Sequence, residues 1–238
     1  MTTLFVSDLH LDDRRPETSR LFIEFLQNEA ATADALYILG DLFEYWLGDD
    51  AVFETARQVA NALSELTGSG VPCYFMHGNR DFLIRQAYAD KTGMVLLPGA
   101  KVIDLYGERV LLLHGDSLCT DDVPFQQFRS IVLNPAWQDD FLTKTPAERL
   151  QVAMQARDAS AEHKGNVTEG IMDVNDGEVI AAFERYGVYR MIHGHTHRPA
   201  THDLLINGKP AQRIVLGDWY SRGSVLRVSP GQFELARL

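Results

Sequence analysis

Carboxylate, imidazole and amide side chains gather in five short segments of this chain of 238 residues. The segments are Ser7-Asp8-Leu9-His10, Gly40-Asp41, His77-Gly78-Asn79-Arg80-Asp81, His114-Gly115-Asp116 and His193-Gly194-His195-Thr196-His197. Such a mixed donor set suits two divalent transition ions that lie about 3.5–4 Å apart and share a bridging carboxylate. Asn79 does not titrate, but its carbonyl oxygen can bind a metal. The residue types therefore predict a two-metal site rather than a calcium site or a structural zinc site.

The spacing of these side chains favours their convergence. Asp8 and His10 are two residues apart, as are His195 and His197, and in an extended chain this spacing puts both side chains of a pair on one face. Six of the 8 histidines of the chain fall in the five segments. Glycines that let the backbone turn tightly or approach a bound group closely accompany four of them: Gly40, Gly78, Gly115 and Gly194.

Other interpretations of the single motifs stay open. A lone Asp-x-His or Gly-His-x-His is more often turn chemistry or a surface group, and we expect His77 and His193, which precede glycines, to face away from the site. A Ser-His-Asp hydrolase with Ser7 or Ser117 as its nucleophile is the competing catalytic hypothesis. The sequence contains no Gly-x-Ser-x-Gly motif, which argues against it.

Each of the five segments begins where an apolar run ends. The runs at residues 4–7, 35–39, 71–76, 110–113 and 190–192 predict strands, and residues 102–105 predict another. In open α/β sheets the ligand site lies beyond the carboxyl ends of the strands. Side chains as far apart in the sequence as Asp8 and His197 can therefore meet at one place.

Helical patterns alternate with these strands. Apolar residues recur at steps of four and three from Val52 to Leu66, residues 21–26 show a similar face, and Asn175 with Glu178 indicates a capping box. After His197, short apolar runs separated by Asn-Gly and Pro-Gly turns predict an antiparallel β tail. The order of elements predicts an α/β (α+β) layered sandwich in a single domain, residues 1–238.

One block interrupts this alternation. Residues 121–170 lack strand patterning, and Phe125, Phe128 and Val132 share one face of a predicted helix, while Leu150 and Met154 share another. We interpret the block as a helical insert, or lid, over the core.

Composition bounds the function. The 22 basic and 33 acidic residues give a formal charge of −11, which argues against a protein that binds nucleic acid through bulk charge. The longest apolar runs have five residues, too few for a membrane span, and no secretory signal precedes the first strand. Cys73 and Cys119 have no paired spacing and are expected to be reduced thiols. These features predict a cytoplasmic protein.

The series Asp-x-His, Gly-Asp, Gly-Asn-x-Asp, His-Gly-Asp and Gly-His-x-His resembles the calcineurin-like metallophosphoesterases. The resemblance implies a four-layer αββα sandwich and two divalent metal ions. It implies that the first ion is held by Asp8, His10, Asp41 and His197. It implies that Asp41, as the bridging ligand, shares the second ion with Asn79, His114 and His195.

Arg80 departs from many members of the family, which carry histidine after Gly-Asn. That histidine helps an alcohol to leave, whereas a phosphate monoester leaves readily because its second pKa is about 6. Arg80 can instead make bidentate contacts to phosphate oxygens, although a structural pairing with Asp81 is an alternative. The substitution favours a diphosphate substrate over an alkyl monoester.

Residues 40–50, 77–82, 114–122, 171–175 and 192–200 are most similar to a branch of this family that acts in lipid A biosynthesis. The resemblance implies attack of metal-activated water on the α-phosphorus of a UDP-linked diacylated glucosamine, giving UMP and 2,3-diacylglucosamine 1-phosphate, usually with Mn²⁺. A broader phosphodiesterase or nucleotide pyrophosphatase is the alternative enzyme, and an inactive scaffold of the same fold is disfavoured.

Carried over by position, the resemblance implies catalytic roles for Asp41, Asn79, Arg80 and His195. It implies substrate contacts from Asn79, Arg80, Asp122, Ser160 and His195. Lys164 stands where the family has a polar residue and Val167 where it has a lysine, so Lys164 is a further candidate contact.

The resemblance also suggests a function for the helical insert. Its apolar face, with Phe125, Phe128, Ile131, Val132, Trp137 and Phe141, is a candidate groove for acyl chains or simply packs on the core. Its basic residues Arg129, Arg149 and Arg157 are candidates for contact with anionic lipid headgroups or for a solvated helix face. We expect a monomer, peripherally associated with the cytoplasmic face of the inner membrane and not bound to nucleic acid.

Overall fold

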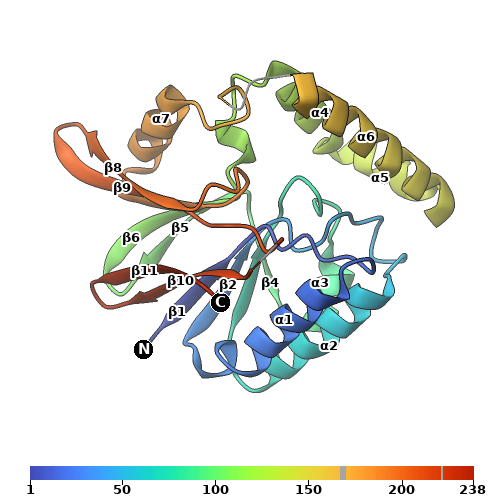
Figure 1. Cartoon of the computed structure of the whole chain (residues 1–238), viewed down its shortest axis with the longest axis horizontal. Coiled ribbons are helices and arrows are strands. Elements are labelled where there is room, and N and C mark those ends of the chain that lie inside the picture. Colours follow the sequence, from blue (N-terminus) through green and yellow to red (C-terminus); the bar gives the residue numbers. More distant parts are fainter. Residues whose placement is uncertain (167–169, 221) are drawn as a thin grey trace.

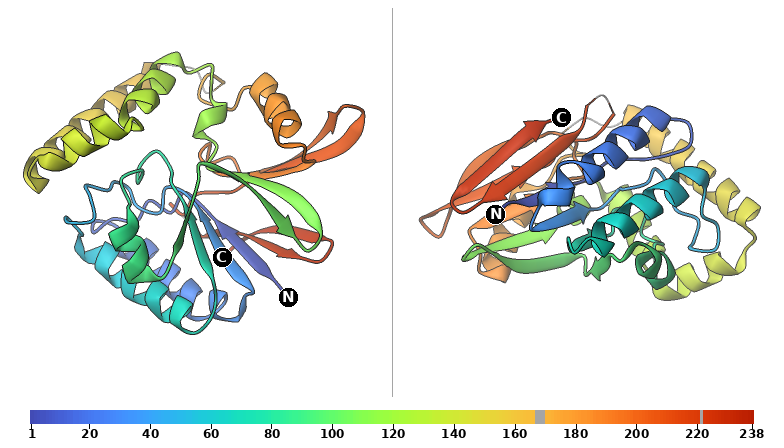
Figure 2. Two further views of the ribbon diagram at one scale, coloured as in Figure 1. Left: turned by 180° about the vertical axis from the view of Figure 1, so that it is seen from behind. Right: turned by 90° about the horizontal axis from the view of Figure 1, so that it is seen from below.

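Two β-sheets pack face to face, and helices cover the outer face of each (Figures 1 and 2). The computed structural model describes residues 1–166, 170–220 and 222–238, and of residues 159–166 it describes the backbone only. In Figure 1, helices α1 (Pro16–Gln27), α2 (Glu54–Gly68) and α3 (Gln86–Thr92) lie below the sheets and α7 (Asp176–Tyr186) lies above them. This is the predicted four-layer αββα sandwich.

The first sheet has the order β11-β10-β1-β2-β3-β4. Its strands β1, β2, β3 and β4 are parallel, whereas β10 and β11 are antiparallel neighbours at one side. The strand bounds are β1 Thr3–Val6, β2 Ala35–Leu39, β3 Cys73–Met76, β4 Val95–Leu97, β10 Ser224–Ser229 and β11 Gln232–Arg237.

The second sheet has the order β5-β6-β7-β9-β8, with β6, β7 and β9 parallel. Its bounds are β5 Ala100–Leu105, β6 Glu108–Leu113, β7 Arg190–His193, β8 Ala200–Ile206 and β9 Lys209–Val215. The predicted antiparallel tail is thus divided. The β8–β9 hairpin joins the second sheet, and the β10–β11 hairpin joins the first.

Three apolar clusters fill the spaces between the four layers. Residues of α1 and α2 such as Phe22 and Leu63 pack on one face of the first sheet, and Phe183 of α7 packs on the outer face of the second. Between the sheets lie side chains such as Phe5 and Ile192, both fully buried. Because the parallel strands β1, β2 and β3 are covered on both faces, they contain no charged residue, and charged side chains appear only beyond their ends.

The helix ends follow local signals. Asn175 caps α7, and its side chain accepts a hydrogen bond from the Glu178 backbone N–H at 3.1 Å, which confirms one half of the predicted capping box. The reciprocal half is wrong, because the Asn175 backbone N–H donates to the Leu118 carbonyl at 2.8 Å. Two 3-10 turns, Ala30–Thr32 and Asp116–Leu118, complete the helical elements of the described chain. The sequence interpretation had no counterpart for β4 or α3, which are three and seven residues long.

A cap of three helices projects from one end of the sandwich (Figure 2). It consists of α4 (Val123–Val132), α5 (Pro135–Thr143) and α6 (Pro146–Asn166), inside the block that the sequence predicts to be helical. Arg149 is only 4% exposed, and its guanidinium donates to both carboxylate oxygens of Asp50 and to the Leu47 carbonyl. The prediction that Arg149 faces lipid or solvent is therefore wrong, because this side chain anchors the cap to the core.

Candidate metal centre and adjoining pocket

Five of the predicted metal ligands have a left-handed backbone. The φ angles are 55° at Asp8, 50° at His10, 52° at Asp41, 70° at His195 and 56° at His197. Residues other than glycine adopt this region rarely, although aspartate and histidine tolerate it better than most. Such conformations persist where the surrounding structure fixes them, and they concentrate at functional sites. All five lie in loops beyond β1, β2 and β7.

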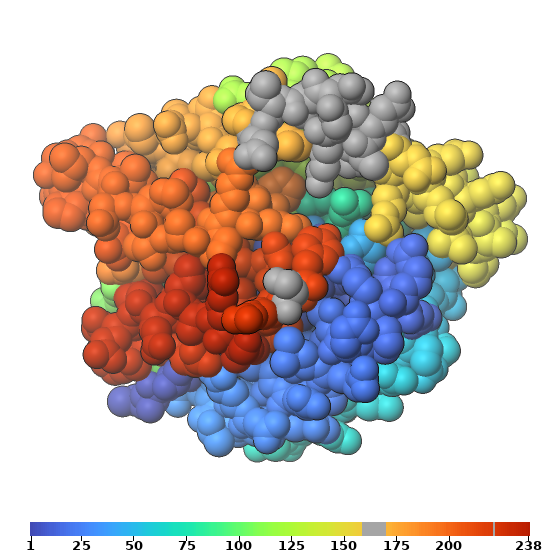
Figure 3. Space-filling model, viewed as in Figure 1, coloured from blue at the N-terminus to red at the C-terminus, as the bar shows by residue number. Residues whose placement is uncertain are grey.

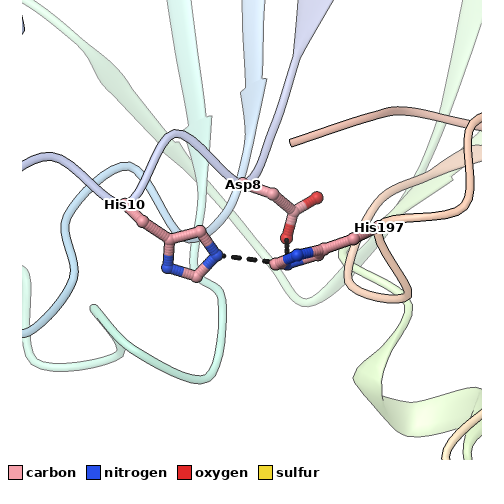
Figure 4. Close-up of side chains that lie close together, drawn as sticks. All are labelled: Asp8, His10 and His197. Carbon is pink, nitrogen blue, oxygen red and sulfur yellow. Dashed lines mark hydrogen bonds and ion pairs between the residues drawn. The ribbon is translucent and has the colours of Figure 1, made fainter. Parts of the chain in front are cut away.

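Asp8, His10 and His197 form one cluster at the ends of β1 and β7 (Figure 4). The Nε2 atoms of His10 and His197 lie 3.2 Å apart, and His197 Nε2 lies 3.4 Å from Asp8 Oδ1. Ligand atoms of the three residues all lie within 4.8 Å of one another. Two imidazole nitrogens and a carboxylate that point at one spot are suitable ligands for a transition metal ion.

Hydrogen bonds from neighbouring residues fix the carboxylate of Asp8. Its fully buried carboxylate accepts hydrogen bonds from Ser7 Oγ at 2.6 Å and from the His195 backbone N–H at 2.9 Å. Burial by itself raises the pKa of Asp8, but the hydrogen bond from His197 and the nearby His114 and His10 outweigh burial and lower it. Asp8 is therefore an anion in the folded protein.

Asn79, His114 and His195 meet at the ends of β3, β6 and β7. The Asn79 Oδ1 atom lies 3.1 Å from His114 Nε2 and 2.9 Å from His195 Nδ1. The other nitrogen of His114, Nδ1, lies 2.8 Å from the Leu39 carbonyl and can only donate to it. In the neutral ring, Nε2 then presents a lone pair to the Asn79 carbonyl oxygen, an arrangement that a positive charge between the two atoms would stabilise.

The pKa of His114 also favours a positive charge at this place. Burial lowers it, but the carboxylates of Asp41, Asp8 and Asp116 outweigh burial and raise it to about 9. The pKa of His195 falls to about 3, through burial and then the neighbouring His114. The site thus stabilises a cation next to His114 while it keeps the other imidazole neutral, and a neutral imidazole is the form that binds a metal.

Asp41 lies between the two clusters. Its Oδ2 lies 3.7 Å from His10 Nε2, and its Oδ1 lies 3.7 Å from His114 Nε2. Asp8, Asp41 and His114 also qualify together as a group that could hold an ion. The structure brings together all seven residues that the sequence assigns to metal, and their donor types fit a pair of divalent ions.

Asp81 connects the loops that carry Asp41 and Asn79. Its fully buried carboxylate accepts backbone N–H groups of Leu42 at 2.7 Å and Gly78 at 2.9 Å, with longer bonds from Asp41 and Phe43. Burial, and then the charge of Asp41, raise its pKa to about 7. The Asp81 carboxylate thus accepts hydrogen bonds from backbone amides. The structure therefore does not support the alternative in which Asp81 forms an ion pair with Arg80.

Glycine permits the closest approach in this region. A Cβ atom at Gly78 would lie 2.1 Å from Asp41 Oδ1, and one at Gly194 would lie 2.2 Å from Asp8 Oδ2. Contacts under 3.0 Å do not occur for real Cβ atoms, so these positions exclude any other residue in this geometry.

Three further residues contact the predicted ligand histidines from outside, and the sequence interpretation did not include them. Asp218 Oδ2 lies 3.6 Å from His197 Nδ1, Glu44 Oε2 lies 3.4 Å from His10 Nδ1, and the Tyr220 ring stacks on His10 with centroids 5.2 Å apart. Asp218 had a sequence signal, because Leu216-Gly217-Asp218 repeats the Gly-Asp ending of an apolar run. Glu44 and Tyr220 had none.

His77 and His193 face away from the site, as predicted. His77 Nε2 donates to the Ile84 carbonyl at 2.6 Å. His193 lies 2.8 Å from the Gly194 carbonyl through Nδ1, and its Nε2 accepts a hydrogen bond from Arg213 at 3.1 Å. These contacts occupy both polar atoms of His193, which therefore serves the packing of the second sheet.

A pocket of about 750 Å³ extends from this site underneath the cap. Glu44, Asn79, Arg80 and Arg157 line its polar end. The remainder is mainly apolar and is lined by Trp46, Phe82, Leu83, Phe125, Phe128, Val132, Trp137, Phe141, Leu150, Val152 and Met154. In Figure 3 the cap, yellow where its side chains are described, stands out from the blue and cyan core. Of the predicted groove residues, only Ile131 does not line the pocket; it is 53% exposed.

The remaining predicted contacts have different surroundings. Asp122 is the N-cap of α4, and its carboxylate accepts the Phe125 backbone N–H at 3.1 Å. Arg129 pairs with Asp116. The side chains of Ser160 and Lys164, and residue Val167, lie outside the part of the chain that the structure describes.

The sequence model of the calcineurin-like phosphoesterase family matches residues 1–199 of this chain. The chain belongs to this family. It is therefore a hydrolase of the metallophosphoesterase superfamily, and membership implies divalent metal ions. None of the helices in the described residues combines the length and apolar character that a membrane span needs.

Curated relatives match the whole chain. A UDP-2,3-diacylglucosamine hydrolase of Stenotrophomonas maltophilia strain K279a is 54% identical, over 100% of this chain and 99% of the relative. One of Xanthomonas axonopodis pv. citri strain 306 is 51% identical over the same shares. Among solved structures, a novel archaeal phosphodiesterase matches 100% of both chains with a TM-score of 0.51 at 11% identity, which supports the fold alone.

Proposed function

We propose that this phosphoesterase hydrolyses the diphosphate of UDP-2,3-diacylglucosamine in lipid A biosynthesis. Attack at the α-phosphorus would give UMP and 2,3-diacylglucosamine 1-phosphate. The observation that carries the proposal is the pocket, whose polar end at Asn79 and Arg80 adjoins the metal centre and whose remainder is apolar. The relatives' shared name supports the same substrate.

We propose that Asp8, His10, Asp41 and His197 hold one ion, and that Asp41, Asn79, His114 and His195 hold the other, with Mn²⁺ as the preferred metal. A pair of divalent ions supplies water activation and neutralises charge on phosphate oxygens. The side chains of the protein would hold the ions and set their positions. The buried donors would hold both ions, and Asp41 would be a ligand of each.

Arg80 and Asn79 are proposed to orient the diphosphate. The Arg80 backbone N–H donates to Asp41 Oδ1 at 2.8 Å, which places its side chain at the border between the metal centre and the pocket. A guanidinium there can bind two phosphate oxygens of the departing sugar phosphate. His195, Asp122, Ser160 and Lys164 complete the proposed set of substrate contacts.

The apolar part of the pocket is proposed to hold the acyl chains. Each methylene that moves from water into it contributes about 0.8 kcal/mol. Trp137 stacks on Phe141 with ring centroids 5.0 Å apart, so this wall is built of flat apolar faces. In this arrangement the insert, residues 121–170 of a single domain spanning residues 1–238, acts as a lid over the lipid.

A lipid substrate places the enzyme at a membrane surface. We propose a cytoplasmic monomer that associates peripherally with the anionic inner face of the inner membrane. Apolar side chains of α4 and its C-terminal end are well suited to such a surface, because Val123 and Ile131 are 56% and 53% exposed. Binding to nucleic acid is not part of this proposal.

The test is hydrolysis of the UDP-diacyl sugar by the purified protein with Mn²⁺ in ¹⁸O water. Label in UMP supports attack at the α-phosphorus, and label in the lipid phosphate contradicts it. Absence of turnover, together with activity on simple phosphodiesters or nucleotide diphosphates, would replace the proposal with a broader phosphodiesterase.

A further inference from the structure

Glu44 is a buried carboxylate that contacts both the metal centre and the cap. Its side chain is 3% exposed and lies in the loop that follows β2. Oε2 lies 3.4 Å from His10 Nδ1 and 3.1 Å from Arg15 Nη2, whereas Oε1 lies 3.3 Å from Arg157 Nη2 on α6. One oxygen thus faces the metal centre and the other faces the cap.

Glu44 is the carboxylate that lies beside the ring of His10. Its Nε2 faces His197, and its buried Nδ1 makes no hydrogen bond within the described residues. Glu44 Oε2 is the carboxylate oxygen beside that nitrogen. A histidine that binds a metal through one nitrogen usually donates the other N–H to a carboxylate or carbonyl, which fixes its tautomer and its orientation.

Arg157 holds the cap at the same carboxylate. Its side chain is 43% exposed and lines the pocket, so its ion pair with Glu44 lies at the border between the pocket and the metal centre. A second pair, Arg149 with Asp50, ties α6 to the core eight residues earlier. That distance is about 12 Å along a helix, and no ligand histidine contacts Asp50 in the described structure.

We propose that Glu44 is a positioning residue that couples closure of the cap to loading of the metal centre, an inference that rests on the proposed metal site. When Arg157 binds Oε1, Glu44 is fixed with Oε2 beside His10. When a metal fixes His10, its Nδ1–H holds Glu44 where Arg157 can reach it. Because coupling is reciprocal, the metal tightens the cap and the closed cap tightens the metal.

The test compares three full-length variants, Glu44→Gln, Arg157→Met and Asp50→Asn. Mn²⁺ affinity is measured by electron paramagnetic resonance titration, and amide hydrogen exchange is followed in residues 146–158 of α6, with and without Mn²⁺. Circular dichroism checks that each variant is folded. Asp50→Asn is the matched control, since it loosens α6 without touching a ligand histidine.

In the wild type, Mn²⁺ should slow exchange in α6. Glu44→Gln should weaken Mn²⁺ binding by about 10- to 100-fold, the usual effect of removing an outer partner of a ligand histidine, and should abolish the slowing. Asp50→Asn should speed exchange but leave Mn²⁺ affinity within about twofold of wild type. Should Glu44→Gln not fold, Arg157→Met carries the test, because Mn²⁺ should then no longer slow exchange in α6.

The inference is overturned if Glu44→Gln binds Mn²⁺ as tightly as the wild type. It is also overturned if Asp50→Asn weakens Mn²⁺ binding as much as Glu44→Gln does, since a loose cap would then suffice. A wild type that fails to bind two Mn²⁺ ions would instead refute the metal site of the proposed function, so the two failures are distinguishable.

Discussion

Replacement of Arg149 by methionine should open the cap without unfolding the core. This buried guanidinium donates five hydrogen bonds. Three go to the carbonyls of Leu47, Leu142 and Lys144, each at 2.8 Å, and two go to the carboxylate oxygens of Asp50. Methionine keeps much of the apolar stem and removes every donor. The loss is therefore one of hydrogen bonds rather than of packing.

Of the three carbonyls, only that of Leu47 belongs to the core, because Leu142 lies in α5 and Lys144 is the residue that ends it. The bond to Leu47 contributes about 1 kcal/mol to holding the cap on the core. The Asp50 side chain is 59% exposed and regains water, so its pair adds at most about 1 kcal/mol. The sum is about 1–2 kcal/mol, which corresponds to an opening constant roughly 5- to 30-fold larger.

Native-state hydrogen exchange of α5 and α6 measures this opening constant directly. The matched control is Arg85→Met, which removes another pair between core and cap, Arg85 with Asp139, whose side chains are 45% and 70% exposed. That variant should change the opening constant by less than about fivefold. If Arg149→Met opens the cap no more than Arg85→Met does, the reasoning from buried hydrogen bonds is refuted.

Other predictions concern the metal centre and its support. His10→Ala and Asn79→Ala should each bind fewer Mn²⁺ ions than the wild type and abolish turnover while the circular dichroism spectrum is retained; wild-type activity in either variant would contradict the ligand assignment. Gly78→Ala should weaken Mn²⁺ binding by at least tenfold, because its Cβ would lie 2.1 Å from Asp41 Oδ1, and an unchanged titration would show that the loop can move. His193 has its pKa lowered to about 4 by burial and then by Arg213, so its neutral form stabilises the fold, and this contribution is lost as pH falls from about 6.5 towards 4. The difference in unfolding free energy between wild type and His193→Gln, from urea denaturation, should shrink by up to about 1.4 kcal/mol per pH unit in that range, and a constant difference would count against it.

The convergence of the proposed metal ligands was predictable because each follows a largely buried strand. An apolar run that ends in Gly-Asp or in His-Gly is a local signal, and the parallel strands then bring these ends together. The same reasoning predicts the cap as helical, since the spacing of Phe125, Phe128 and Val132 is local too. Element order predicted a layered α/β sandwich, whereas the four-layer αββα arrangement was implied by the resemblance to the family.

The contacts that hold the site were not predictable in this way. Asp81 binds backbone amides of a loop about 40 residues earlier, and Arg149 binds Asp50 across 99 residues. Neither partner changes the local pattern of the sequence. The division of the tail between the two sheets has the same origin, because a hairpin specifies its own pairing but not the sheet that it joins. The short elements β4 and α3 are too brief to show a periodicity.

The left-handed backbone of the ligand residues bears on the history of the fold. Each such residue costs roughly 1–2 kcal/mol compared with glycine, and the core must offset this for five positions, which are Asp8, His10, Asp41, His195 and His197. A descendant that no longer needs the chemistry gains stability by placing glycine there. We therefore expect glycine at some of these five positions in a scaffold of this fold that has lost the chemistry and kept only its shape.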